Sequence, residues 1–219
     1  MRKLFVLGFI ALALFFGFNQ DTYALCDIVV PNGSGNDITC QPPVQNVTLG
    51  VPPATTMDDT VTVLSGGGVV IPGAGTAIST SGGSDTINVG PGANVSGTSG
   101  IISGSETSPA GDIINITGGV IAGTNFAIGG QGGDDILTIS GGTINGEIDM
   151  GSDDDSITIS GGNINGDVDP GQGTNDVLIT GGTFTNSGIQ RQSNFGSVEI
   201  AADVTLDFIG CGGPLTFSM

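Results

Sequence analysis

A short phrase that begins with Asp or Asn and continues with alternating aliphatic residues recurs along the chain. Between residues 135 and 183 it returns every 20 residues, as in Asp135-Ile-Leu-Thr-Ile-Ser-Gly-Gly and then Asp155-Ser-Ile-Thr-Ile-Ser-Gly-Gly. A unit that repeats at a fixed period is typical of a solenoid, because one unit cannot bury its apolar side alone. The sequence therefore predicts a stack of similar coils that share one core.

Each copy of the phrase has the period of a β-strand and is rich in Val and Ile, which favour strands. A degenerate copy closes the series at residues 198–200, and the earlier copies start at Asp59, Asp85, Asp112, Asp135, Asp155 and Asn175. Their spacings of 26, 27, 23, 20 and 20 residues predict an all-β, single-stranded parallel β-helix of about seven coils. Crossover chirality favours a right-handed coil.

The alternation also predicts which side chains point into the core. Thr138 and Thr158 are expected to point outward, and the inward set is Leu137, Ile139, Ile157, Ile159, Val177 and Ile179. A Gly-Gly pair after each strand predicts a corner, since Gly adopts backbone angles that other residues avoid. A second short strand follows, with inward columns formed by Ile144, Ile164 and Phe184, and by Ile148 and Val168. Beside it, Asn145 and Asn165 are expected to form an amide ladder along the stack.

The first 24 residues are typical of a secretory signal peptide, with Arg2 and Lys3 ahead of a 15-residue apolar run. Cleavage is expected after Ala24; an uncleaved anchor is the alternative, although the run is short for a membrane span. We therefore divide the chain into a signal peptide (1–24), an N-terminal cap (25–58), a β-solenoid (59–202) and a degenerate or truncated end (203–219).

The three cysteines are expected to form one disulfide in an oxidising compartment. Cys26 and Cys40 are close in sequence and are expected to pair after export. A bridge over about 15 residues stabilises by roughly 3 kcal/mol in the chain-entropy model, at the end where a solenoid needs a cap. Cys211 is left over, which predicts a free thiol or a partner missing from this sequence. We expect the chain to be the N-terminal part of something longer.

Removing residues 1–24 leaves a strongly acidic chain without His, Trp or Tyr. Its one basic side chain is Arg191, against 20 carboxylates, which are the 21 of the whole chain less Asp21. Binding to nucleic acid or to anionic lipid is excluded, because both need basic contacts. Without His, neither a Ser-His-Asp nor a Cys-His arrangement can form.

Ten of those 20 carboxylates lie between residues 134 and 176. The 20-residue period stacks Glu147 on Asp167 and Asp149 on Asp169, and like charges on adjacent strands repel. A hard divalent cation such as Ca2+ relieves such repulsion with several oxygen ligands. The predicted metal ligands are Asp134, Asp135, Asp153, Asp154, Asp155 and Asp176. The alternative is a solvated acidic face that is screened by salt.

The early Cys pair and the segments Ser140-Gly-Gly-Thr-Ile-Asn-Gly-Glu-Ile-Asp149 and Asp153-Asp-Asp-Ser-Ile-Thr-Ile-Ser-Gly-Gly162 resemble the passenger repeats of bacterial autotransporters. The resemblance spans most of residues 25–210. It implies a parallel β-helix displayed at the cell surface and a C-terminal β-barrel translocator. These 219 residues contain no run of alternating ten-residue barrel strands. The resemblance is thus to a truncated passenger or to a relative exported by another route.

A second resemblance is local. Gly129-Gly-Gln-Gly-Gly-Asp134-Asp-Ile136-Leu is similar to the calcium-binding nonapeptide of repeats-in-toxin proteins. It implies Ca2+ at the turn, although its register is one residue off the coil pattern, which pairs Asp135 with Leu137.

These observations lead us to expect an exported, non-catalytic β-helix passenger segment, a stalk or adhesin-like surface module with an unknown surface or host ligand. A secreted calcium-binding repeat module is the alternative. A polysaccharide-active β-helix enzyme is a third interpretation, since paired carboxylates are the minimum equipment for glycoside hydrolysis. The shortage of aromatic and basic side chains for binding a sugar argues against it.

Overall fold

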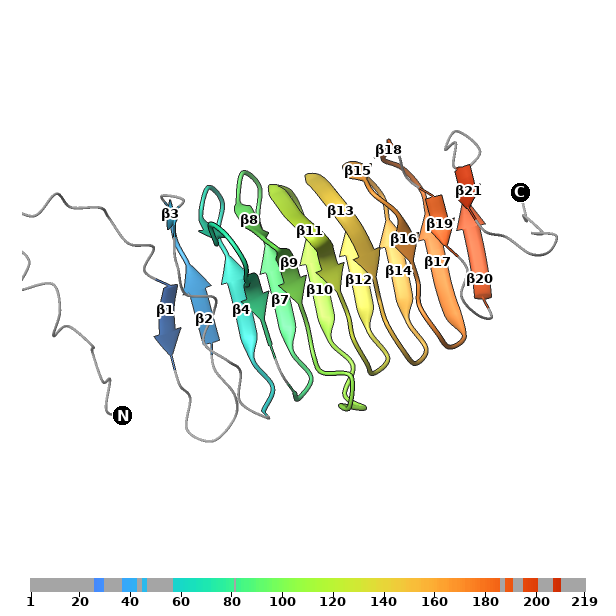
Figure 1. Ribbon diagram of the computed structural model, residues 1–219, viewed down its shortest axis with the longest axis horizontal. Coiled ribbons are helices and arrows are strands. Elements are labelled where there is room, and N and C mark those ends of the chain that lie inside the picture. The colour runs from blue at the N-terminus through green and yellow to red at the C-terminus, as the bar shows by residue number, and fades with distance from the viewer. Residues whose placement is uncertain are drawn as a thin grey trace, which may run out of the picture.

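The computed structural model describes residues 26–29, 37–42, 45–46, 57–80, 82–185, 188–190, 195–200 and 207–209. In these residues the chain is an elongated stack of β-coils (Figure 1). The predicted signal peptide, Arg191 and Cys211 lie outside them. The described part of the chain contains no helix long and apolar enough to span a membrane.

One wall of the stack is a nine-stranded sheet in which every pairing but the first is parallel. Its order is β1 (Cys26–Val29), β2 (Asp37–Cys40), β4 (Thr60–Val63), β7 (Thr86–Val89), β10 (Ile113–Ile116), β12 (Ile136–Ile139), β14 (Ser156–Ile159), β17 (Asn175–Ile179) and β20 (Phe195–Ile200). The strands expected from the repeated phrase are therefore present and stack in sequence order. From β4 to β20 they bound six complete turns, which confirms the predicted parallel β-solenoid.

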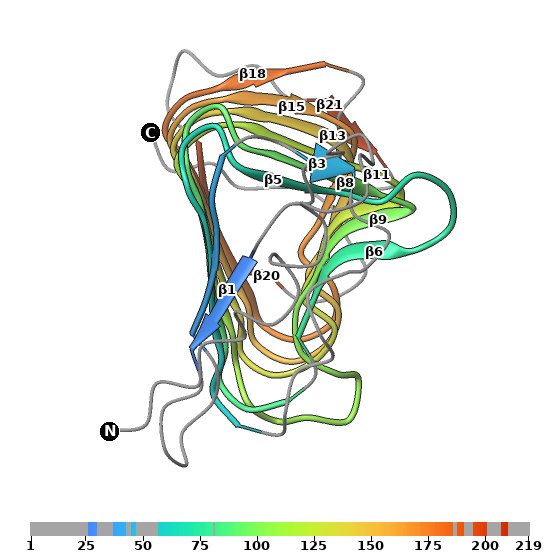
Figure 2. The ribbon, with the colours of Figure 1, turned by 90° about the vertical axis from the view of Figure 1, so that its left-hand side faces the viewer.

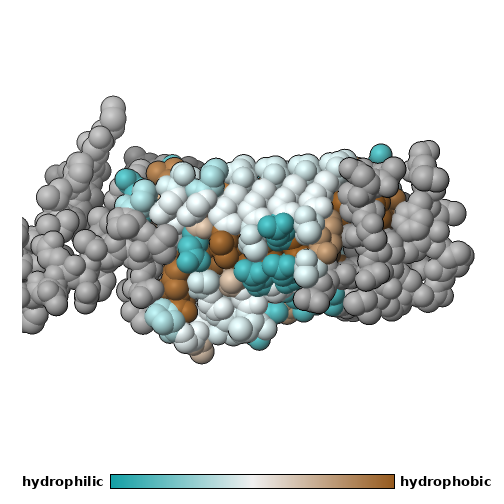
Figure 3. All heavy atoms as spheres, turned by 90° about the horizontal axis from the view of Figure 1, so that it is seen from above, coloured by the Kyte–Doolittle hydropathy of each residue, from teal (hydrophilic) through white to brown (hydrophobic). Residues whose placement is uncertain are grey.

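A twelve-stranded sheet closes the coils (Figure 2). Its main path is β3 (Gln45–Asn46), β5 (Gly68–Val70), β8 (Asn94–Gly97), β11 (Val120–Gly129), β13 (Thr143–Asp149), β16 (Val168–Asp169), β19 (Gly188–Gln190) and β21 (Asp207–Ile209). Four further strands join it: β6 (Thr76–Ser79), β9 (Ser99–Ile102), β15 (Asn163–Asn165) and β18 (Thr183–Phe184). Seen from above, residues of intermediate hydropathy predominate on the described surface, between smaller hydrophilic and hydrophobic patches (Figure 3).

The core is a set of columns in which each side chain lies on its equivalent in the next coil. Leu137 pairs with Ile157, which pairs with Val177, and the neighbouring column is Ile139, Ile159 and Ile179. All six predicted inward residues are at most 1% exposed, whereas Thr138 and Thr158 are half-exposed on the outer face. The columns of the second wall are also as predicted, since Ile144 pairs with Ile164 and Ile148 with Val168.

The Gly-Gly corners keep this register. The second glycine has a left-handed φ in each of four successive coils, at Gly119, Gly142, Gly162 and Gly182. At Gly142 a Cβ atom would lie 2.7 Å from the carbonyl oxygen of Gly119 in the coil before. Glycine is required there both by the backbone angle and by the close approach of the next coil. The predicted amide ladder is also present, because Asn165 Nδ2 donates to Asn145 Oδ1 at 2.8 Å.

The N-terminal end is built differently from the coils. β1 runs antiparallel to β2, with Cys26 opposite Cys40 and Val29 opposite Asp37. Cys26 and Cys40 form a disulfide with an S–S distance of 2.10 Å, the pairing expected from their spacing. Cys40 is fully buried and pairs with Val63 of β4, so the disulfide joins β1 to the N-terminal end of the core.

Replacing Ile159 with Asp tests the register of the core. Ile159 has apolar neighbours in the coils on both sides, so an unpaired charge there should lower the free energy of unfolding by about 4 kcal/mol or more. Thr158→Asp, one residue earlier and on the outer face, should change it by less than about 1 kcal/mol. Thermal melts followed by circular dichroism decide; equal losses in the two variants would contradict this register.

Candidate functional site

A column of carboxyl groups runs through the interior of the solenoid. The first residue of the repeated phrase is buried in every coil, with exposures of 0 to 2% for Asp59, Asp85, Asp112, Asp135, Asp155 and Asn175. Carboxyl groups are almost never fully buried unless they have partners. The buried carboxyl groups of this column, rather than the exposed acidic residues, are therefore the most unusual polar feature of the fold.

The backbone of each coil binds the acid of the next. The backbone N–H of Asp85 donates to Asp112 Oδ1 at 2.6 Å, and that of Asp112 donates to Asp135 Oδ1 at 2.7 Å. The same bond joins Asp59 to Asp85 at 2.6 Å, Asp135 to Asp155 at 2.9 Å and Asp155 to Asn175 at 2.7 Å. Each acid therefore satisfies a buried N–H that would otherwise cost about 1–3 kcal/mol.

Asn175 differs from the acids of the column in its second polar side-chain atom, which is Nδ2 instead of Oδ2. Asn175 Nδ2 donates to the carbonyl oxygens of Pro170 at 2.8 Å and Gly171 at 3.2 Å. The equivalent Oδ2 atoms of Asp135 and Asp155 are buried and have no hydrogen-bond partner. A carboxylate oxygen can only accept, whereas a protonated Oδ2 donates as the Asn amide does. An ionised Oδ2 at these positions would therefore be a buried charge without a hydrogen bond, which is costly.

The electrostatics of the column agree with its geometry. Burial raises the pKa of Asp112 to about 6 and the pKa values of Asp135 and Asp155 to about 8, and the charge of the neighbouring acid adds to the effect. Burial also raises the pKa of Asp85. The N–H bonds to Oδ1 act in the opposite direction but are outweighed. At neutral pH Asp135 and Asp155 therefore keep their protons, whereas Asp112, with the lower pKa, is mainly ionised.

The predicted metal ligands do not form one group. Asp135 and Asp155 lie in the buried column, whereas Asp134, Asp153 and Asp154 are exposed on the turns that precede β12 and β14. Asp176 is exposed on β17, where its Oδ1 accepts from Ser197 Oγ at 2.7 Å. The described residues include no group of three or more His, Cys, Asp or Glu side chains arranged to hold a metal ion.

The exposed acids of the turns hydrogen bond from coil to coil. Asp134 Oδ1 accepts from the backbone N–H of Asp154 at 3.0 Å, and Asp154 Oδ1 accepts from that of Thr174 at 2.7 Å. Asp153 Oδ2 accepts from the N–H of Gly133 at 3.1 Å. These carboxylates serve as turn caps, which is a structural reason for their recurrence.

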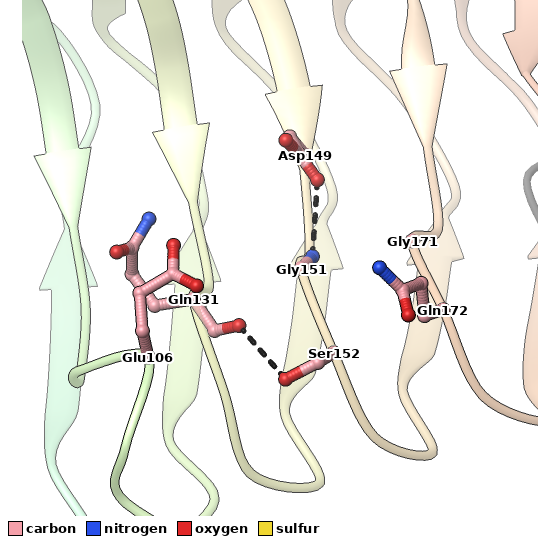
Figure 4. A pocket seen from close by; sticks show the side chains of 7 residues that line it. All are labelled: Glu106, Gln131, Asp149, Gly151, Ser152, Gly171 and Gln172. Carbon is pink, nitrogen blue, oxygen red and sulfur yellow. Dashed lines mark hydrogen bonds between the residues drawn. The ribbon is translucent and has the colours of Figure 1, made fainter.

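A small polar pocket opens on another side of the coils, where the loop between β9 and β10 meets the turns that follow β11, β13 and β16 (Figure 4). Its volume is about 180 Å³, and it is lined by Glu106, Gln131, Asp149, Gly151, Ser152, Gly171 and Gln172. Asp149 Oδ1 accepts from the N–H of Gly151 at 3.0 Å. The lining offers carboxylate, amide and hydroxyl oxygens, but no basic side chain.

Negative charge accumulates beside this pocket. Asp149 pairs with Asp169 across β13 and β16, as the 20-residue period predicts. Partial burial, and then the charges of Asp149, Asp169 and Asp167, raise the pKa of Glu147. Burial and the charge of Asp169 likewise raise the pKa of Asp149. A cation bound at this surface would relieve part of that repulsion.

Sequence reasoning missed the buried column, although the signal was present. Asp135, Leu137 and Ile139 are two residues apart, so strand alternation places all three on the same face. We assigned Leu137 and Ile139 to the core but grouped Asp135 and Asp155 with an acidic cluster because of their charge. Following the alternation one step further would have placed the acids inside.

Comparison with known proteins identifies no relative. No family model, curated protein or solved structure matches the chain.

Replacing Asp155 with Asn tests the protonated column. The folded pKa of about 8 exceeds the ordinary value of 3.8, so the folded chain holds this proton while the unfolded chain releases it. Stability should be greatest near pH 4, fall by up to about 1.4 kcal/mol per pH unit for each such carboxyl, and level off above pH 8. The side-chain amide introduced by Asp155→Asn supplies an N–H donor and does not ionise. The variant should therefore raise the free energy of unfolding at pH 8 by roughly 2–5 kcal/mol and change it little at pH 4.

The matched control is Asp134→Asn, which removes one charge from an exposed neighbour and should give a much smaller change in pH dependence. Denaturant unfolding at pH 4, 6 and 8 measures all three chains. A stability that rises from pH 4 to pH 8, or an Asp155→Asn variant with the same pH dependence as the parent, would show that the column is ionised.

Proposed function

We propose that the chain is an exported, non-catalytic β-helical segment that serves as a stalk or adhesin-like passenger at a cell surface. The observation that carries the proposal is the parallel register from β4 to β20, continuous except for one register shift between β17 and β20, in which successive coils present similar classes of residue to each other. Such a stack contacts only its neighbours and extends in one direction. A rigid rod suits the task of holding something away from a surface.

The proposal of a non-catalytic role rests on the chemistry of the side chains. The chain after residue 24 has no His and one basic residue. The pocket beside Asp149 is lined without a cation that would orient an anionic substrate or stabilise developing negative charge. The recurring carboxylates have structural tasks as turn caps and as members of the column.

Export is proposed from the signal-like N-terminus and is consistent with a disulfide at the first strand. We place the chain beyond the inner membrane, at the cell surface or outer membrane or in the medium. A C-terminal translocator and a surface or host ligand would be its partners.

A calcium-binding repeat module is the second candidate. It is favoured by the oxygen-rich pocket, in which Glu106 and Asp149 lie with the amides of Gln131 and Gln172, next to the repelling pair of Asp149 and Asp169. Ca2+ accepts irregular sets of six to eight oxygen ligands, including water.

Expression of the whole chain in a Gram-negative host tests export. We expect a mature protein that begins at Leu25 and is recovered outside the cytoplasm, because a signal peptidase would cleave after Ala24. Mass spectrometry of the intact protein locates the N-terminus. An intact Met1 in the cytoplasmic fraction would refute export, and release of reducing ends from a polysaccharide panel would refute the non-catalytic role.

Calcium titration tests the second candidate. If a site exists, Ca2+ should raise the melting temperature more than Mg2+ does at equal ionic strength, because Mg2+ requires near-octahedral geometry. Glu106→Gln/Asp149→Asn should abolish the difference if the pocket binds the ion, and Asp153→Asn/Asp154→Asn should abolish it if the exposed turns do. If both ions raise the melting temperature equally, the effect is screening of an acidic surface and the calcium-binding candidate is refuted.

A further inference from the structure

The first strand is an addition to the solenoid rather than one of its coils. β1 lies at the end of the nine-stranded sheet and pairs, among the described strands, with β2. Its pairing is antiparallel, whereas the other strand pairs of the described residues are parallel. β1 therefore continues neither the winding nor the core columns of the coils that follow.

The disulfide ties this strand to the core. Cys26 is the first residue of β1 and Cys40 the last of β2, and the two lie directly opposite each other with a Cα–Cα distance of 4.1 Å. Cys26 is only partly buried and packs against the core, whereas Cys40 is fully buried. Among the described residues, β1 is held by this bond and by a four-residue antiparallel pairing with β2 at the edge of the sheet.

The second strand has a firmer hold. β2 pairs in parallel with β4 over Asp37 to Cys40, in register with residues 60–63, and Ile38 and Cys40 extend the columns that begin with Val61 and Val63. Losing the disulfide thus affects β1 and β2 unequally. β2 remains part of the stack, while the edge that β1 covers becomes open.

We propose that the Cys26–Cys40 disulfide is a redox latch that holds β1 over the edge of β2. A dithiol reductant would attack the less buried sulfur, Cys26 Sγ, with Cys40 as the leaving thiolate. The protein disulfide gains two electrons and two protons to become two thiols, and the reductant becomes a disulfide. β1 then detaches and leaves β2 as an open edge strand, which is a template for pairing with another strand. The coils from β4 onward stay folded.

This inference does not depend on the proposed surface role, because it concerns only the end of the sheet. Its test is hydrogen–deuterium exchange of the full chain in a Cys211→Ser background, before and after treatment with dithiothreitol. We expect at least tenfold faster exchange in peptides covering residues 26–40 and unchanged exchange over β12 and β14. Reoxidation should restore protection.

Cys26→Ser with Cys40 retained gives the unlatched chain without reductant and keeps the buried sulfur in place. It should exchange like the reduced parent. Equal protection of residues 26–40 in the reduced and oxidised chains would show that strand pairing alone holds β1. Loss of protection over β12 and β14 on reduction would make the disulfide a staple for the whole fold. Either result overturns the latch.

Discussion

The parallel hydrogen bonding of each coil to the next is the constraint on which the structure depends. A coil offers its backbone donors and acceptors to the coil on either side, so neighbouring coils must keep the same path wherever their strands pair. Gly142 shows how strict this is, because the space a Cβ atom would occupy there is already close to the carbonyl oxygen of Gly119. Because the backbone path repeats from coil to coil, the residues that this path requires also repeat in the sequence.

The buried acids extend that constraint to side chains. Where the repeated phrase begins, the backbone N–H of one coil donates to a carboxyl oxygen of the next coil. The cost is a set of carboxyl groups without water around them. Protonation lowers that cost, and Asn175 avoids it, since its amide supplies both the acceptor for Asp155 and donors for Pro170 and Gly171.

The acidic residues thus have two different physical roles within short stretches of sequence. Asp134 and Asp135 are adjacent, yet one caps an exposed turn and the other is 1% exposed inside the column. The six predicted metal ligands likewise fall into two groups, two of them buried in the column and four of them exposed. The pocket beside Asp149 combines several oxygen atoms with unrelieved negative charge because the loop from Glu106 reaches over turns of later coils.

The sequence by itself determined the all-β class, the order of the strands, the inward columns, the glycine corners and the asparagine ladder. These follow from local alternation and from a fixed period, both of which can be read without knowing the path of the chain. Tertiary structure decided which neighbours satisfy the buried acids, which of those acids keep their protons and how the pocket is assembled. Those features depend on contacts between residues 20 or more positions apart, and the charge of an aspartate does not reveal whether its proton stays with it in the fold.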